Sequence, residues 1–333
     1  MTSRFTDLSL HCSACQGDLE EGADQFQCRN CARRFPVLFG IPDFRLTGDL
    51  YLTLADERAK AGRLHEFAQR HSFAELVEYY YSITDDVPPS LTKKFIAYIK
   101  DAPARMLLVL GALDAPGRDS RLLDLGCATG GALVAGDVFS RCVGVDIALR
   151  WLVICQKRLE ELGIESHLIC ADVEALPFSA GQFSHVLAND LIEYARRPKD
   201  AVAGCAAQVA PGGHLYLSAS NRWWPGPHPA VGIWAAGLLP RPIRSFVAER
   251  HRGVDVLRHA RFVSSSQTGR WLRDSGLRIC EAGPKRTGAP SSTFSRTRAA
   301  LVAAYRTASS IPGLRQVMVA AGPAFEIIAK KPT

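Results

Sequence analysis

The chain has 333 residues, of which 47% are hydrophobic and 22% are charged, and its formal net charge is +7. This composition is ordinary for a globular protein with a sizeable core, and it excludes a low-complexity chain. No apolar stretch approaches the roughly 20 residues that a bilayer-spanning helix needs, so no transmembrane segment is expected. The first ten residues lack an apolar run behind a basic stretch, which predicts the absence of a secretory signal peptide.

Basic residues are concentrated in one part of the chain. The segment 241–298 holds 13 Arg or Lys residues against four Asp or Glu residues, so its local excess of positive charge exceeds that of the whole chain. Such an excess favours an anionic partner, which includes phosphate, nucleic acid and acidic lipid surfaces. The alternative is a solvated arginine-rich surface without a specific partner.

Residues 1–48 are predicted to form a zinc ribbon. Four cysteines stand in two C-x2-C pairs separated by twelve residues, namely Cys12, Cys15, Cys28 and Cys31. Each pair can present two thiolates to one ion, and four thiolates match a closed, tetrahedral structural zinc site. The other six cysteines lie in apolar contexts, where isolated thiols usually behave as small hydrophobic side chains. This pattern predicts structural Zn²⁺ in a reducing, cytoplasmic compartment rather than a disulfide framework.

Residues 49–115 are predicted to form a helical cover. Their apolar spacing indicates four helices, interrupted by the Val87–Pro88–Pro89 sequence, at about 56–70, 73–81, 91–100 and 104–113.

From residue 116 onward, short apolar runs alternate with helical patterns. The expected strands are 122–125, 142–145, 167–170, 185–188 and 214–218, followed by two more at 277–281 and 325–329. This alternation predicts βα units and a parallel sheet. The fold class is therefore α/β, with a doubly wound, seven-stranded Rossmann-like sheet over residues 116–333 and an insertion at about 222–262.

The strongest functional signal is the sequence LLDLGCATGG at residues 122–131, in which an apolar strand leads into a glycine-bearing turn. Gly126 and Gly130 permit a tight backbone turn and the close approach of a ligand. Asp146 stands at the tip of the second strand, where a carboxylate can bond ribose hydroxyls. Asp172 follows the third strand, and Asn189 ends the fourth.

This succession resembles the class I S-adenosylmethionine-dependent methyltransferases, densely over about 120–220 and more loosely beyond. The resemblance implies S-adenosyl-L-methionine as cofactor, with the methionine part facing Asp124 and Gly126 and the ribose held by Asp146. It further implies that Ile147 packs on the adenine, that Asp172 and Val173 contact its edge, and that Asn189 lies near the sulfonium. A nicotinamide cofactor is not expected, because the turn lacks the third glycine of GxGxxG.

Ala128 departs from the family pattern, because it stands where these enzymes usually have a glycine between Gly126 and Gly130. Alanine can still pack beside the ligand if its φ angle is negative, so we expect the turn to bind the cofactor.

The segment at 33–44 resembles the zinc ribbons that partner and activate methyltransferases, and this resemblance implies a docking or structural role. A closed four-thiolate site has no open position for catalysis.

The acceptor is expected to bind beyond the fourth and fifth strands, where Trp223, Trp224, Trp234 and His228 follow in the sequence. Apolar walls with one titratable group suit a small or lipid-like acceptor. His228 is the predicted general base, with His251 as second candidate; alternatively, His228 is a turn residue hydrogen-bonded to backbone. The sequence therefore predicts O-methylation of a small acceptor (a natural product, sugar or lipid-like molecule), apolar or anionic.

Two other functions remain open from the sequence. The basic segment 241–298 and the fused ribbon favour methylation of an RNA base in ribosomal or transfer RNA. The fourth strand ends in Asn189–Asp190–Leu191–Ile192, which is not the Asn-Pro-Pro-Tyr type used on exocyclic base amines, and this excludes only some RNA chemistries. The third possibility is a cofactor-binding partner subunit without catalytic activity.

Overall fold

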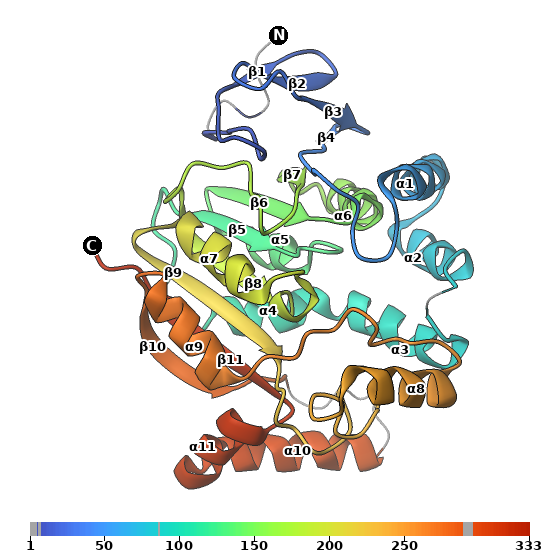
Figure 1. Cartoon of the computed structure of the whole chain (residues 1–333), viewed down its shortest axis with the longest axis vertical. Coiled ribbons are helices and arrows are strands. Elements are labelled where there is room, and N and C mark those ends of the chain that lie inside the picture. Colours follow the sequence, from blue (N-terminus) through green and yellow to red (C-terminus); the bar gives the residue numbers. More distant parts are fainter. Residues whose placement is uncertain (1–4, 6–7, 86, 289–295) are drawn as a thin grey trace.

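A seven-stranded sheet forms the centre of the computed structural model, which describes residues 5, 8–85, 87–288 and 296–333 (Figure 1). In spatial order its strands are β10 (Arg278–Pro284), β11 (Ala324–Lys330), β9 (Val209–Ser220), β8 (Phe183–Asn189), β5 (Arg121–Leu125), β6 (Arg141–Asp146) and β7 (His167–Cys170). The five strands from β9 to β7 pair in parallel, whereas β11 is antiparallel to both of its neighbours. The predicted doubly wound α/β sheet of seven strands is confirmed.

The direction of winding reverses next to β5. The chain runs outward from β5 through β6 to β7 and then returns to β8, which pairs with β5 on its other side. In open α/β sheets, ligands bind beyond the carboxyl ends of the strands at such a reversal. The topology therefore places the expected ligand site beyond the ends of β5 and β8.

The central strands are apolar on both faces of the sheet. In β5, Leu122 packs in one hydrophobic core and Leu123 in the core on the opposite face, and both side chains are fully buried. Continuous apolar runs of this kind are typical of parallel strands that are covered on both sides. The alternation along β5 thus explains why two separate cores flank one sheet.

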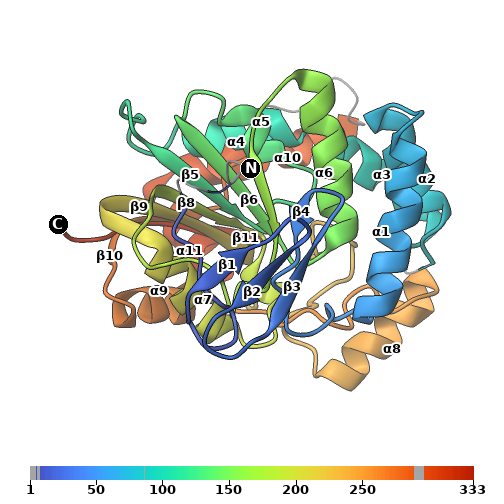
Figure 2. The same ribbon diagram turned by 90° about the horizontal axis from the view of Figure 1, so that it is seen from above.

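Helices cover both faces of the sheet. On one face, α1 and α2 pack against α6, and α4 packs against α5 (Figures 1 and 2). On the other face, α7 and α9 pack together. α11 lies against β10, and α10 lies against α11. The bounds are α1 (Leu54–Ala68), α2 (Phe73–Ser82), α4 (Ala102–Leu110), α5 (Gly131–Ala135), α6 (Leu149–Leu162), α7 (Pro198–Gln208), α9 (Ser265–Asp274), α10 (Arg296–Ser310) and α11 (Pro312–Ala321). Among the described helices, none is both long and apolar enough to cross a membrane.

The N-terminal ribbon shares its core with the central sheet. Its strands are β1 (Leu19–Glu21), β2 (Gln25–Cys28), β3 (Arg34–Leu38) and β4 (Ile41–Pro42), which pair successively in antiparallel fashion. Phe26, Phe35 and Phe44 belong to the same hydrophobic cluster as Ile169 of β7. Because Asp43 also forms a parallel bridge with Cys170, the chain leaving the ribbon extends the sheet beyond β7.

The helical cover and the insertion after β9 pack against each other. The insertion contains α8 (Arg241–Arg252), and the cover contains α3 (Pro89–Lys100). Leu91 of α3 belongs to one buried cluster with Val231, Ala248 and Leu257 of the insertion. Two segments more than 130 residues apart in sequence therefore close over the carboxyl edge of the sheet together.

A buried ion-pair network joins the ribbon to the loop that follows β6. The Asp43 carboxylate accepts hydrogen bonds from Nε and Nη2 of Arg45 at 2.7 and 2.9 Å, and from Arg58 of α1 at 2.9 Å. Arg45 also donates to the carbonyl oxygen of Ile147 at 2.9 Å. Burial by itself raises the pKa of Asp43, but the hydrogen bonds and charges of the two arginines hold it below its ordinary value. A parallel network joins Arg150 of α6 to Asp49 and Glu57.

Replacing Asp43 with alanine should lower the free energy of unfolding by about 3–5 kcal/mol, because it leaves the buried Arg45 without its counter-charge. Urea denaturation measures this change. The matched control is Glu20→Ala, which removes an exposed ion pair with Arg29 and should cost less than about 1 kcal/mol. Since the folded pKa of Asp43 is depressed, its stabilisation should be present at neutral pH and lost as the pH falls through that pKa. Equal effects of the two substitutions would contradict this role for the network.

Candidate active site

The glycine turn after β5 has a backbone that only glycine adopts easily. Gly126 and Gly130 have φ angles of +73° and +74°, in the left-handed region. A Cβ atom on Gly130 would lie 2.6 Å from the Sγ atom of Cys155, which is too close for any side chain. The N–H groups of Gly126 and Cys127 both donate to the carbonyl oxygen of Val145, at 2.8 and 3.0 Å. These bonds fix the turn against the end of β6.

Ala128 does not meet the condition under which alanine packs easily beside a ligand, namely a negative φ angle. Its φ angle is +44°. A left-handed conformation costs a residue with a Cβ atom about 1–2 kcal/mol. The N–H of Ala128 donates to Oδ2 of Asp146 at 2.9 Å, and this bond holds the residue in its unfavourable conformation.

Asp146 connects the tip of β6 with two neighbouring loops. Its Oδ1 accepts the N–H of Ala148 at 2.8 Å, while its Oδ2 accepts that of Ala128. Burial raises the pKa of Asp146, and these two N–H donors work against that rise. Asp124 is buried beside it, and burial together with the charge of Asp146 raises the pKa of Asp124 to about 8. Contact of these two residues with the ribose and methionine parts of the cofactor stays a prediction.

Asp172 already has partners on both carboxylate oxygens. Its Oδ1 accepts the N–H of Glu174 at 3.0 Å, and its Oδ2 accepts Nη1 of Arg196 at 2.7 Å. Arg196 also donates to the carbonyl oxygen of Gly48, which ties this strand tip to the segment that follows the ribbon. An adenine amino group bound at Asp172 would donate to carboxylate oxygens that already accept these hydrogen bonds. Arg196 was not predicted, because no local motif connects it with Asp172. Val173 is buried in the adjoining core, and Ile147 is half-buried.

Four segments of the chain meet at Asp190, directly after β8. Its carboxylate accepts a hydrogen bond from Lys285 at the end of β10, one from Ser218 of β9 at 3.2 Å, and one from Tyr98 of α3 at 3.5 Å. Ser218 also donates to Oδ1 of Asn189 at 2.9 Å. Burial raises the pKa of Asp190, but the charge and hydrogen bond of Lys285 hold it below its ordinary value. The sheet thus presents an ionised carboxylate at the winding reversal.

The sequence analysis did not single out Tyr98 or Lys285, although both contact Asp190. They lie 92 and 95 residues from it in the chain.

The φ angle of Asp190 is +54°, and a non-glycine residue in this conformation is often found at a functional site. This strain could not be deduced from the sequence, since aspartate adopts many backbone conformations.

Glu193 is a buried carboxyl group in the short 3-10 helix Ile192–Tyr194. Its Oε1 accepts the N–H of Ser220 at 2.9 Å, whereas its Oε2 is buried and has no partner within the described residues. Burial, followed by the charge of Asp190, raises the pKa of Glu193 to about 7. A carboxyl group with this pKa can exchange a proton near neutral pH.

His228, the predicted general base, is buried in a turn of the insertion. Its Nδ1 accepts the N–H of Ala230 at 3.3 Å, which places the proton on Nε2. Its ring lies edge-on to Phe262, and burial lowers its pKa to about 4. This geometry matches the alternative in which His228 is a turn residue bonded to backbone, so a catalytic role for it stays a prediction. The second candidate, His251, is exposed on the last turn of α8.

The four predicted metal ligands come together in the ribbon. The Sγ atoms of Cys12, Cys15, Cys28 and Cys31 all lie within 4.8 Å of one another. The Cys12–Cys31 and Cys15–Cys28 pairs are 3.7 and 3.5 Å apart. Tetrahedral zinc with bonds of about 2.3 Å separates its sulfur ligands by about 3.8 Å, so the arrangement fits structural zinc. The backbone N–H of Cys31 also donates to the sulfur of Cys28, at 3.4 Å.

Comparison with known proteins agrees with the geometry. Residues 123–217 match a family model described as a methyltransferase domain. The chain carries an S-adenosylmethionine-dependent methyltransferase domain. The matched residues run from β5 to β9 and therefore include the glycine turn and the tips of β6, β7 and β8. S-adenosylmethionine is the methyl donor of enzymes with this domain.

Two relatives bear the name ubiquinone biosynthesis O-methyltransferase. The one from Coxiella burnetii is 25% identical over 169 residues, which is 49% of this chain and 66% of the relative. The one from Burkholderia pseudomallei is 26% identical over 185 residues, covering 54% of this chain and 72% of the relative. The chain thus spans about two thirds of the length of the Coxiella relative.

Solved structures with a similar arrangement have low identity. One is from a Haloferax volcanii complex between the Trm112 methyltransferase activator and a methyltransferase, with 19% identity and a TM-score of 0.47. That match covers 72% of this chain and 93% of the other. Another is geranyl diphosphate C-methyltransferase from Streptomyces coelicolor, with 19% identity, a TM-score of 0.46, and coverage of 68% and 75%.

Replacing Cys28 with serine should abolish stoichiometric zinc binding, because a three-thiolate site loses its closed tetrahedral shell. Zinc content, measured by mass spectrometry after dialysis, tests this. Cys280→Ser is the control, since Cys280 is exposed and lies outside the cluster, and that variant should retain one zinc per chain. Retention of one zinc by the Cys28 variant would contradict the assignment.

The raised pKa of Asp124 predicts a pH-dependent stability. The folded protein holds this proton up to about pH 8, whereas the unfolded chain releases it near pH 4. The contribution of Asp124 is therefore fully present below about pH 4 and lost as the pH rises to 8, by up to about 1.4 kcal/mol per pH unit. Relative to an Asp124→Asn variant, the wild-type protein should lose stability between pH 5 and 8.

Denaturation at several pH values, without cofactor, measures the difference between the two proteins. Asp137→Asn changes an exposed carboxylate near the end of α5 and should leave the pH dependence of stability as in the wild type. A constant difference between wild type and Asp124→Asn across this range would refute the buried, protonated carboxyl group.

Proposed function

We propose that this protein methylates a hydroxyl group of a small acceptor that binds beyond the carboxyl ends of β8 and β9. The main support is that α3 and the insertion after β9 contact each other and cover this edge of the sheet. Lys94 of α3 donates hydrogen bonds to the carbonyl oxygens of Pro229 and Ala230 in the insertion, at 2.7 and 2.6 Å. A site enclosed by a helix and an insertion suits a small molecule better than a polymer.

The polar groups at Asp190 support an acceptor with a hydroxyl group. The Asp190 carboxylate accepts hydrogen bonds there from the ammonium group of Lys285 and the phenol of Tyr98. Such a group of donors and acceptors can orient a hydroxyl oxygen toward the methyl donor. Because the sulfonium donor is already activated, alignment of this kind supplies much of the rate enhancement.

Glu193 is the proton acceptor in this proposal. Methyl transfer to a neutral hydroxyl releases a proton, and a base with a pKa near neutrality takes it up efficiently. Glu193 has a pKa raised to about 7 and one carboxylate oxygen without a partner in the described structure. His228 suits this role less well, because its Nδ1 already accepts a hydrogen bond.

The names of the Coxiella and Burkholderia relatives support oxygen as the acceptor atom, although their identity to this chain is only 25–26%. The basic segment 241–298 supports the alternative, methylation of an RNA base. Salt dependence separates the two, since binding to an RNA backbone weakens steeply as the salt concentration rises.

Transfer of a radioactive methyl group from S-adenosylmethionine should label a small-molecule fraction of a cell extract and not the RNA fraction. The Glu193→Gln variant should bind S-adenosylmethionine normally, lose activity by about 10²–10⁴-fold, and lose the rise in rate through pH 7. Glu160→Gln, at an exposed glutamate of α6, is the control.

Three outcomes would overturn parts of the proposal. Labelling of RNA alone would establish the alternative substrate class. Loss of the pH-dependent rise in His228→Gln, with the rise intact in Glu193→Gln, would make His228 the base. A wild-type protein that binds the cofactor but labels neither fraction would favour a non-catalytic subunit.

A further inference from the structure

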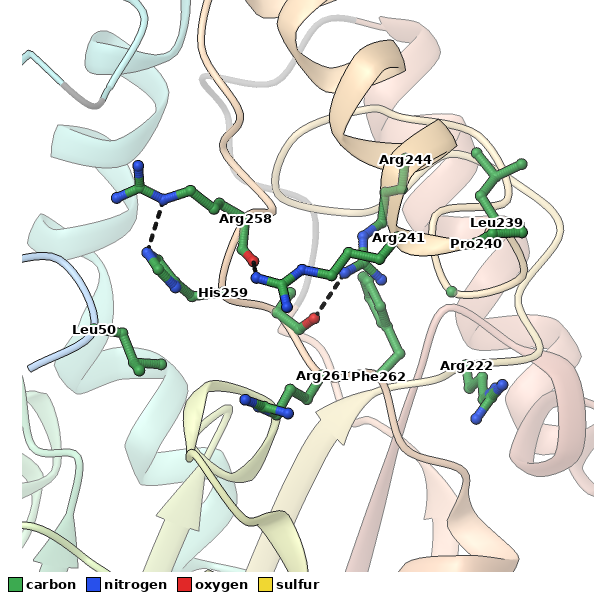
Figure 3. Close-up of a pocket in the computed structure, with 12 residues that line it drawn as sticks. Leu50, Arg222, Leu239, Pro240, Arg241, Arg244, Arg258, His259, Arg261 and Phe262 are labelled. Carbon is green, nitrogen blue, oxygen red and sulfur yellow. Dashed lines mark hydrogen bonds between the residues drawn. The ribbon is translucent and has the colours of Figure 1, made fainter.

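A pocket lined by arginines lies next to the proposed acceptor site. It has a volume of about 290 Å³, and Arg222, Arg241, Arg244, Arg258, Arg261 and His259 contribute to its wall. Figure 3 shows Arg241 and Arg244 of α8 side by side, with Arg258, His259 and Arg261 of the segment after α8 and Arg222 of the segment before it around them. Among the residues that the structure describes, no acidic one lines the pocket. We call it the arginine pocket.

Arg244 is the buried cation of the arginine pocket. The residue is 7% exposed, and its Nε has no hydrogen-bond partner in the described structure. Its Nη2 donates to the carbonyl oxygen of Ala260 at 3.0 Å, and its guanidinium lies 5.3 Å from the ring of Phe262. Among the described residues no ion pair is formed by Arg244, and the charge of Asp255 acts on it without a direct contact. A buried guanidinium without a contacting counter-charge is unfavourable, which points to an anion as its partner.

Backbone oxygens and a neutral ring hold the neighbouring arginines in place. Arg241 donates from Nη2 to the carbonyl oxygen of Arg258 at 3.1 Å, and Nε of Arg258 donates to Nε2 of His259 at 2.9 Å (Figure 3). These bonds orient the guanidinium groups without neutralising them. Planar guanidinium groups with uncompensated charge are the usual partners of phosphate oxygens.

The helix that begins at the arginine pocket adds to its positive potential. α8 starts at Arg241, after Pro240, with no side chain capping its amino end and no acidic residue in its first turn. The amino end of a helix is itself partially positive and repels the positive charge of arginines placed there, unless an anion binds between them. Arg241 and Arg244 both stand in this first turn.

The arginine pocket adjoins the edge at which methyl transfer is proposed. The N–H of Arg261 donates to the carbonyl oxygen of Glu193 at 2.7 Å. Arg222 follows the end of β9 by two residues, and the ring of His259 packs edge-on against Tyr51 at 4.7 Å. The arginine pocket therefore lies on the same edge of the sheet as Asp190 and Glu193, close to the backbone of Glu193.

We propose that the arginine pocket binds the phosphate or diphosphate group of a phosphorylated small acceptor. This inference rests on the proposed function, because it assigns the anionic end of the same acceptor. The small volume suits one or two phosphoryl groups, whereas an RNA backbone would need a continuous basic surface outside the pocket.

Binding of inorganic pyrophosphate to the full-length protein tests the site directly, by calorimetry at low salt. The wild-type protein should bind one equivalent. The Arg241→Gln/Arg258→Gln variant should bind at least tenfold more weakly. Its control, Arg250→Gln/Arg270→Gln, removes the same charge from exposed positions outside the pocket and should bind as the wild type does.

Arg244→Met separates binding from folding. Removing a buried charge that lacks a counter-charge should leave the melting temperature unchanged or higher, while pyrophosphate binding is lost. Equal weakening in the control variant, or no pyrophosphate binding by the wild type, would overturn the arginine pocket as a phosphate site. Tighter binding of an RNA oligonucleotide that the control variant also weakens would overturn it in favour of a polyanion surface.

S-adenosylmethionine binding, measured on the same samples, keeps the two proposals distinct. Normal cofactor binding without pyrophosphate binding contradicts only the arginine pocket. Pyrophosphate binding without cofactor binding contradicts the proposed function and leaves the anion site in place.

Discussion

The hydrogen bonds that the Asp146 carboxylate accepts hold together the loops of the predicted cofactor site. The carboxylate accepts one N–H from the glycine turn and one from the start of α6, and so joins the loops after β5 and β6. Burial raises the pKa of this carboxyl group, and the two N–H donors, together with the charge of Arg150, work against that rise. The same bond keeps Ala128 in a left-handed conformation. The shape of the turn is thus set by a charge on the neighbouring strand as well as by its glycines.

Carboxyl groups and arginines occupy different parts of the carboxyl edge of the sheet. Asp124 and Asp146 lie at the ends of β5 and β6, with Asp124 protonated at neutral pH, and Asp190 follows β8 in an ion pair with Lys285. Arginines gather beyond β9, in a pocket that no acidic residue of the described part of the chain lines. The basic part suits an anionic acceptor. Glu193 adjoins it, bonded through its backbone oxygen to Arg261.

The ribbon contributes to this edge through the chain that leaves it. Asp43 and Arg45 are buried together, and Arg45 reaches the carbonyl oxygen of Ile147, beside the tip of β6. Zinc binding would therefore stabilise a unit whose last residues support the loop next to the cofactor site. Arg196 ties the segment after the ribbon to the end of β7, because it donates hydrogen bonds both to Asp172 and to the carbonyl oxygen of Gly48.

The sequence by itself determined the sheet, the glycine turn and the metal ligands, because each depends on residues close together in the chain. Periodicity marks a strand, two glycines mark a turn, and C-x2-C spacing marks a pair of thiolates. Only the tertiary structure decided the partners of Asp190, the sign of φ at Ala128 and the hydrogen bond that occupies Nδ1 of His228. It also gathered arginines from the basic segment and from the end of β9 into one pocket. Strand order and packing set such contacts, and no local pattern records which distant side chains they bring together.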